Sequence, residues 1–175
     1  MHNTHEISKN IYWVGGSERR LSRFENMFPL TNGIAYNAFV IVDEKTVLLD
    51  TVDISISDLF LANVKHALDG RTLDYLVINH MEPDHCANIV AILNLYPNVK
   101  LIGNAKTFQF FEQFYDVDVK SNYQVIKDQD ELHLGTHTLK FFTAAMVHWP
   151  EAMVTYEKSE KILFSADAFG TFGGL

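Results

Sequence analysis

The amino-acid sequence predicts a mixed α/β fold in which sheets pack in layers and helices cover their outer faces. Strand-like and helix-like segments alternate through the middle of the chain, which is typical of sheets with helices packed against them. Residues 73–78 are mostly apolar, as expected for a strand that is covered on both faces. On either side of this region, short apolar segments are joined by polar turns, which favours hairpins.

In the first part of the chain, each element follows from a local pattern. A short strand over 11–14 ends at two glycines, and a polar turn joins the strands over 36–42 and 46–49 into a hairpin. Residues 57–68 carry apolar side chains at helical spacing, with Ser57 as the expected N-cap.

Beyond the strand at 73–78, the sequence predicts two more helices and the remaining strands. A helix over 87–95 is closed by Pro97, and a helix over 107–114 follows a strand over 99–102. From residue 123 onward, polar turns separate short strands over 123–126, 132–134, 138–143, 153–156 and 162–165.

Composition indicates one globular domain over residues 1–175. Apolar residues make up 47% of the sequence, and no linker-like stretch marks an internal boundary. The net charge of -8 argues against nucleic acid as a partner, because proteins that bind it carry a basic stripe. The single cysteine suits a reducing compartment. Without a recognisable signal peptide or an apolar stretch of roughly 20 residues, we expect a cytoplasmic protein with no membrane partner.

Four metal-capable side chains fall within six positions directly after the strand at 73–78, namely His80, Glu82, Asp84 and His85. The first three alternate, so in an extended segment they would point the same way. Pro83 is expected to keep this segment out of a helix, with His85 at the start of the next one. Such a loop can deliver ligands to one metal and to a neighbouring second metal. The alternative is a solvated acidic loop in which Asp84 only caps a helix.

His148 and Asp167 each lie close to the end of an apolar segment. Alone, His148 is typical of a core histidine and Asp167 of a turn residue. Beside the first cluster both become candidate ligands, and the two oxygens of Asp167 could bridge two cations. We expect Trp149 and Phe169 to pack beside this pocket, and His137 to be exposed.

The sequence resembles the flavodiiron proteins in three motifs, which are His80-x-Glu82-x-Asp84-His85, His148-Trp149-Pro150 and Asp167-Ala168-Phe169-Gly170. The segments 11–15, 36–39 and 49–52 are similar to the opening strands of that family. The resemblance implies a metallo-β-lactamase-like αββα sandwich, incomplete at its C-terminal side. The hydrolytic branch of this superfamily usually has histidine in place of Glu82, and a carboxylate there suits iron better than zinc.

The resemblance implies a pair of irons held by His80, Glu82, Asp84, His85, His148 and Asp167. In this arrangement His80, Glu82 and His148 hold one iron, Asp84 serves the second, and Asp167 bridges them. His85 stands at a motif position whose ligation varies within the family. Family members reduce O2 to water or NO to N2O with electrons from FMN. The FMN is expected on a flavodoxin-like domain or a partner, with an electron donor such as rubredoxin or a flavin reductase, in a head-to-tail homodimer.

The chain also departs from the family pattern. The flavodoxin-like domain is absent from it, and so are the later part of the sandwich and another histidine ligand of the second iron. We therefore interpret residues 1–175 as the N-terminal portion of the metallo-β-lactamase-like domain, weak or inactive alone. Some family members have a histidine facing the irons near residues 23–25, where this chain has Glu25.

Two alternative functions use the same residues. One is a diiron module that senses O2 or NO without flavin. The other is a zinc hydrolase of the metallo-β-lactamase superfamily. Metal content distinguishes the hydrolase from the other two, because only the hydrolase requires zinc.

Overall fold

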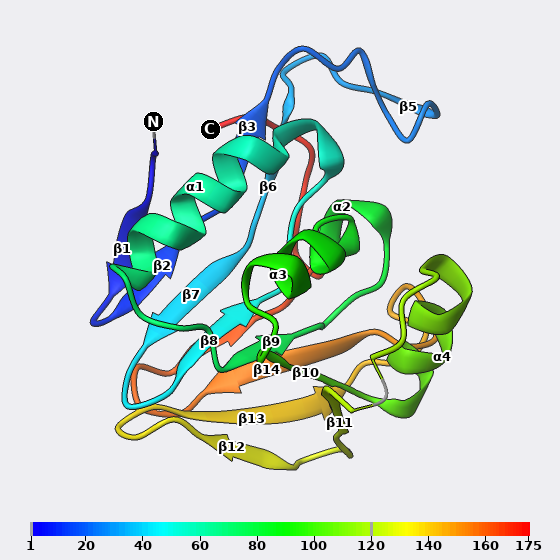
Figure 1. Ribbon diagram of the computed structural model, residues 1–175. Helices are drawn as coiled ribbons and strands as arrows, with labels where there is room; N and C mark the ends of the chain where they lie inside the picture. The colour runs from blue at the N-terminus through cyan, green and yellow to red at the C-terminus, as the bar shows by residue number, and fades with distance from the viewer. Residues whose placement is uncertain (1, 120) are drawn as a thin grey trace.

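The computed structural model describes residues 2–119 and 121–175, which form two facing sheets with helices against one outer side (Figure 1). Sheet layers with helices packed outside were predicted from the alternating pattern, and this prediction is confirmed.

The larger sheet has seven strands in the order β1-β2-β7-β8-β9-β10-β11. Their bounds are β1 His5–Ser8, β2 Ile11–Trp13, β7 Phe39–Val42, β8 Thr46–Leu49, β9 Tyr75–Val77, β10 Lys100–Gly103 and β11 Tyr123–Val125. The strands from β1 to β8 pair antiparallel, and those from β8 to β11 pair parallel. Parallel pairing needs crossover segments, which the helices supply.

The smaller sheet is an antiparallel meander of four strands. Its strands are β12 Glu131–His133, β13 Thr138–Thr143, β14 Met153–Glu157 and β15 Ile162–Phe164. Two short ribbons complete the strand set, β3 Gly16–Glu18 with β6 Ile34–Tyr36 and β4 Arg23–Phe24 with β5 Phe28–Pro29.

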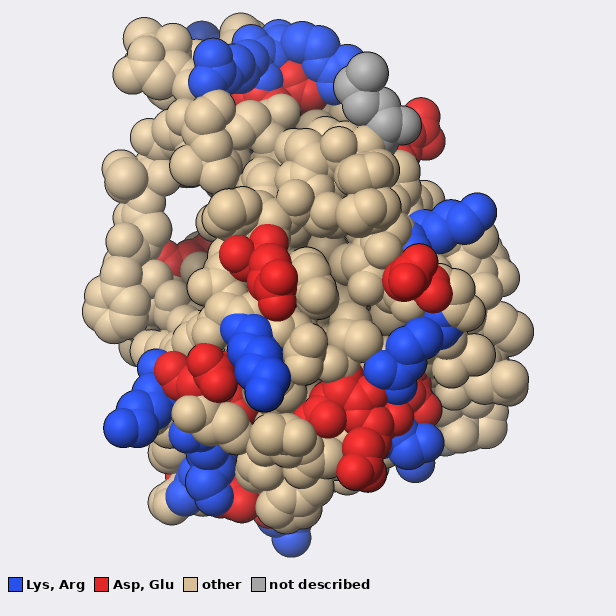
Figure 2. Space-filling model, turned by 90° about the vertical axis from the view of Figure 1, so that its left-hand side faces the viewer, with Lys and Arg blue, Asp and Glu red and all other residues tan. Residues whose placement is uncertain are grey.

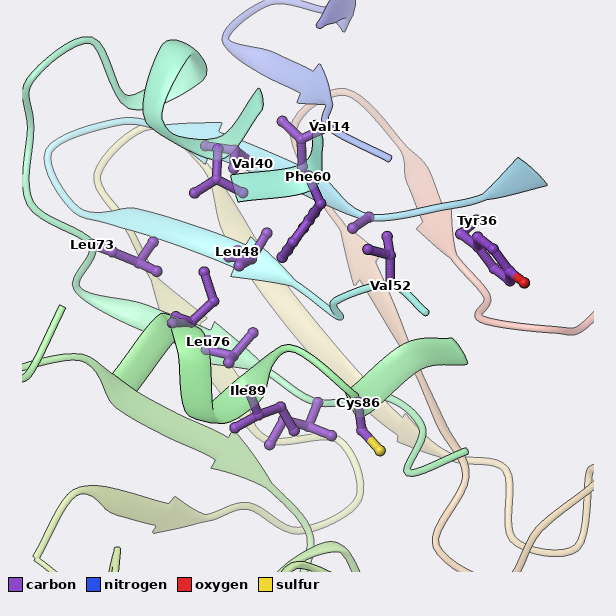
Figure 3. Close-up of a cluster of buried hydrophobic side chains, with 14 of the residues drawn as sticks. Val14, Tyr36, Val40, Leu48, Val52, Phe60, Leu73, Leu76, Cys86 and Ile89 are labelled. Atoms are coloured by element: carbon purple, nitrogen blue, oxygen red, sulfur yellow. The ribbon is translucent and has the colours of Figure 1, made fainter. Parts of the chain in front are cut away.

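The helices are α1 Ser57–Leu68, α2 Pro83–Cys86, α3 Ile89–Leu95 and α4 Ala105–Phe114, and the 3-10 turn η1 Ile54–Ile56 leads into α1. Each contributes buried side chains to one cluster on the outer face of the larger sheet. Figure 3 shows part of this cluster, including Phe60 of α1, Cys86 of α2 and Ile89 of α3. No helix in the described part of the chain is both long and apolar enough to cross a membrane.

Side chains of the central strands point alternately to the two faces of the larger sheet, so an apolar layer lies on each face. Leu48 and Leu76 point toward the helices, whereas Val47 and Val77 point toward the smaller sheet. Phe141 of β13 closes the layer between the sheets and is fully buried. Strand ends on the two sheets are thereby held next to each other, which is what positions the site.

Several predicted elements differ from the structure in their bounds or caps, and three of these differences have a clear local cause or position. The strand predicted over 36–42 breaks at Asn37, because β6 pairs with β3 whereas β7 pairs with β2. Ser57 is not an N-cap, since the turn η1 precedes it and the side chain of Asp53 caps that turn by accepting from the backbone N–H of Ser55 at 2.8 Å. The helix predicted over 87–95 begins at Ile89.

Charged side chains of both signs are interspersed over the face shown in Figure 2, where blue and red groups lie next to one another. The surface of the protein also carries ion pairs, including Lys45 with Asp74 at 3.1 Å and Lys158 with Glu131 at 2.9 Å. Such exposed pairs contribute little to stability, because water and salt screen their attraction.

The prediction that His137 is exposed is wrong. His137 is 2% exposed, and its Nδ1 lies 3.1 Å from Oε1 of the fully buried Glu157. Glu157 also accepts the backbone N–H groups of Ser159 and Glu160, at 3.0 and 2.6 Å. Burial would raise the pKa of Glu157, but these backbone hydrogen bonds and His137 outweigh it and lower the pKa.

Because its pKa is lower folded than unfolded, Glu157 stabilises the fold above its unfolded pKa, near 4.3. That contribution is lost as the pH falls through the lower folded value. Glu157→Gln should therefore cost about 1–3 kcal/mol at neutral pH and make stability less dependent on pH in the acid range. Urea unfolding from pH 3 to 7 measures this, and an unchanged acid slope would contradict it.

Candidate metal centre

The candidate ligands lie at one shared edge of the two sheets. His80 and Glu82 follow β9, and Asp84 and His85 lie in the short helix α2. The smaller sheet supplies the other two, because His148 lies between β13 and β14 and Asp167 in the turn after β15. The structure thus brings all six predicted residues together from two sheets.

Pro83 acts differently from the prediction. It occupies the first position of α2 instead of keeping the segment extended, and Glu82 precedes it as an N-cap residue with extended backbone angles. Proline suits that position because its missing N–H would lack a helical partner anyway. The turn of helix directs Asp84 and His85 away from the line of His80 and Glu82.

The first donor group consists of His80, Glu82, His148 and Asp167, whose donor atoms lie within 4.8 Å of one another. Nε2 of His80 lies 2.9 Å from Glu82 Oε2 and 3.3 Å from His148 Nε2. Asp167 Oδ2 lies 3.2 Å from His80 Nε2 and 3.1 Å from His148 Nε2. Two imidazole nitrogens and two carboxylate oxygens therefore converge on one point.

The second donor group consists of Asp84, His85 and Asp167. Nε2 of His85 lies 2.6 Å from Asp167 Oδ1 and 3.5 Å from Asp84 Oδ2. Asp167 thus presents Oδ2 to the first group and Oδ1 to the second. One carboxylate shared between two donor groups is the arrangement that a binuclear metal site requires.

The electrostatics of the cluster favour positive charge. Burial would lower the pKa of His80, but hydrogen bonds with carboxylates, Asp167 first, raise it to about 11. Burial also opposes protonation of His85, yet the bond with Asp167 helps raise its pKa to about 9. Burial raises the pKa of Asp84 to about 6. Protons and cations compete for the same donor atoms in such a cluster.

A cavity of about 350 Å³ opens onto both donor groups. Its apolar wall includes Phe24, Ile34 and Phe172. A larger cleft of about 650 Å³ is lined by Glu18, Arg20 and Ser55 among others. None of the candidate ligands lines it, so it is separate from the candidate metal centre.

Two aromatic predictions had opposite outcomes. Trp149 packs edge-on against the ring of His80, with centroids 5.2 Å apart, as expected for a residue beside the site. Phe169 is 92% exposed, so the expectation that it packs there is wrong. Glu25 stands where some family members have a histidine facing the irons. Burial and the neighbouring Glu82 raise the pKa of Glu25.

Sequence reasoning missed two carboxylates that form hydrogen bonds with the candidate ligand His80 or with its neighbours in the chain. Glu151 accepts hydrogen bonds from His80 Nδ1 at 2.7 Å and from the backbone N–H of Met81 at 2.8 Å. Asp50 accepts from the backbone and side chain of Asn79 at 2.7 and 2.9 Å. The available signal was that each is an acid near a candidate ligand or at a strand end. Their hydrogen-bond partners, however, lie 29 to 71 positions away in sequence.

The fold and the site together define a metallo-β-lactamase-like domain with a candidate binuclear metal centre. Residues 34–174 match the family described as ODP family beta lactamase. The chain belongs to this family, and its sequence relatives and structural neighbours include flavodiiron proteins.

Two curated relatives are nitric oxide reductases by name. The chain is 37% identical over 165 residues to the nitric oxide reductase of Moorella thermoacetica, covering 94% of this chain and 41% of that protein. It is 36% identical over 169 residues to the anaerobic nitric oxide reductase flavorubredoxin of Aliivibrio salmonicida, covering 95% and 34%. The chain therefore spans less than half the length of these relatives.

Two solved structures share the fold closely. The flavodiiron protein from Giardia intestinalis superposes with a TM-score of 0.92 at 26% identity, covering 99% of this chain and 42% of that one. Rubredoxin oxygen:oxidoreductase from Desulfovibrio gigas gives a TM-score of 0.88 at 30% identity, covering 99% and 43%.

Proposed function

We propose that this chain forms the diiron core of an oxidoreductase that reduces NO to N2O, O2 to water, or both. The observation that carries the proposal is the position of Asp167, whose two oxygens lie in two different donor groups. The names of the relatives and structural neighbours support the same reaction class.

The donor set fits a pair of irons. The first donor group offers two imidazoles and two carboxylates, and the second offers one imidazole and two carboxylates. Oδ1 of Asp84 and Nδ1 of His85 are buried without a hydrogen-bond partner, so each residue has unused capacity. A carboxylate at Glu82 makes the set harder and more anionic, which favours iron over zinc.

The chain's own residues would hold the ions and control access to them. When bound, the two irons would supply electrons to a small diatomic molecule. Asp167 would fix the separation of the ions, and Trp149 packs against His80 to limit its motion. Phe24, Ile34 and Phe172 would exclude bulk water from the cavity above the ligands.

The electron balance indicates further partners. Two NO take up two electrons and two protons to give one N2O and one water. Two ferrous ions can supply these two electrons once, and the protons come from solvent. Reduction of O2 to two water molecules needs four electrons and four protons, so continued turnover requires an external reductant. We propose that this reductant is FMN on a flavodoxin-like domain or partner. We further propose a donor such as rubredoxin or a flavin reductase, a homodimeric assembly, and the cytoplasm as the compartment that keeps such donors reduced.

A single-turnover experiment tests this function without any flavin. The protein is loaded with Fe(II) under anaerobic conditions and given NO, and N2O is measured by gas chromatography. We expect N2O only from the iron-loaded protein, in an amount of at most about one per iron pair, and none from zinc-loaded protein. Reversible NO binding without N2O would indicate a sensor, and hydrolysis by zinc-loaded protein would indicate a hydrolase. Either result would contradict the proposal.

A further inference from the structure

The buried carboxylate of Glu151 contacts the back of a candidate ligand. Its Oε1 lies 2.7 Å from Nδ1 of His80, the ring nitrogen opposite the one in the first donor group. The same oxygen accepts the backbone N–H of Met81 at 2.8 Å. Glu151 and His80 are 0% and 1% exposed, so water does not compete for this contact.

This contact determines which ring nitrogen carries the proton. An ionised carboxylate can only accept, so Nδ1 of His80 must be the donor. A metal that binds His80 must therefore displace the proton from Nε2, whose lone pair then lies beside Glu82 and Asp167, while Nδ1 keeps its proton. A histidine bound to metal usually donates its other N–H to such a partner, which orients the ring and strengthens its basicity.

Glu151 is itself held rigidly. Its backbone carbonyl accepts Nδ2 of Asn104 at 2.7 Å, and the side chain of Asn104 caps the first turn of α4. Glu151 also lies three positions after His148, so one loop carries a ligand and the residue that orients another ligand. Its second oxygen, Oε2, is buried without a partner, which leaves His80 as the only side chain bonded to this carboxylate among the described residues.

We propose that Glu151 is the positioning residue for His80, fixing its tautomer and ring orientation so that Nε2 faces the metal. The proposal rests on the proposed function only in assuming that a metal binds at the first donor group. A merely structural role, in which Glu151 anchors the Met81 backbone, would affect stability but not the affinity for metal.

Zinc is the probe that separates these roles, because it is diamagnetic and binds the same kinds of donor. Three variants are compared with the wild type. Glu151→Gln keeps an acceptor but loses the charge, and Glu151→Ala loses both. Glu157→Gln is the matched control, since Glu157 is equally buried, contacts a histidine and accepts two backbone N–H groups, yet lies at the far end of β14.

Zinc affinity is measured by competition with a chelator, and the Nδ1 proton of His80 by NMR of the zinc-loaded protein. We expect Glu151→Gln to bind zinc about 10–100-fold more weakly, with an upfield shift of that proton, and Glu151→Ala to bind it more weakly still. Glu157→Gln should keep wild-type affinity despite lower stability. If Glu151→Ala does not fold, Glu151→Gln decides the result.

Equal zinc affinity in wild type and Glu151→Gln would overturn the positioning role. So would an equal loss of affinity in Glu157→Gln, since that would trace the effect to stability. If the Glu151 variants bind zinc weakly but iron-loaded wild type makes no N2O, the proposed function fails and the positioning role stands.

Discussion

Asp167→Ala is expected to abolish binding of the metal pair and, with it, reduction of NO and O2. Asp167 is the only residue among those described that belongs to both donor groups, with Oδ2 3.1 Å from His148 Nε2 and Oδ1 2.6 Å from His85 Nε2. Its loss removes an oxygen donor from each site at once. Residues that only orient a ligand are worth about 10–100-fold in affinity, so losing a shared ligand should cost more.

Metal content after desalting, measured by elemental analysis, checks this expectation. Asp116→Ala is the control, because Asp116 is exposed and belongs to neither donor group. It should retain wild-type metal content. Two metals per chain in Asp167→Ala would show that the ligand assignment is wrong.

The largest effect on stability is expected from Asp50→Ala. Asp50 is 5% exposed and joins the end of β8 to the segment carrying His80, through two hydrogen bonds from Asn79. Asn79 in turn accepts Oγ1 of Thr155 at 2.6 Å, which ties the larger sheet to the smaller one. Removing the carboxylate leaves both Asn79 donors unpaired, together with the backbone N–H of His80, which lies 3.4 Å from Oδ1. Each well-formed bond lost costs about 1–3 kcal/mol.

We therefore expect Asp50→Ala to lower the free energy of unfolding by about 3 kcal/mol or more, a large share of the roughly 5–15 kcal/mol typical of a domain. It should also weaken metal binding, because the backbone before His80 loses its support. Urea unfolding measures the first effect. A change within about 0.5 kcal/mol, the range of the exposed control Asp116→Ala, would show that this network does not support the fold.

The candidate ligands could be picked out from sequence because their signals are local. His80, Glu82, Asp84 and His85 crowd into one segment after a buried strand, and a strand end is where a sheet presents side chains to a ligand. His148 and Asp167 gained their significance from that cluster and from the family resemblance. The sheet layers could be predicted because buried strands and amphipathic helices each have a recognisable spacing.

What could not be predicted depends on contacts between distant positions. Glu151 lies near a candidate ligand and Asp50 at a strand end, but only folding brings them to His80 and Asn79. His137 follows a polar hairpin turn, yet the fold buries it against Glu157. Pro83 was expected to prevent a helix because proline breaks helix interiors, but at the first position of a helix it is favoured.

The identity and number of metals in the protein purified without oxygen from its own host distinguish the diiron centre from its alternatives. We expect two irons per chain, both lost in Asp167→Ala. Stoichiometric zinc in place of iron, or a single metal per chain, would contradict it.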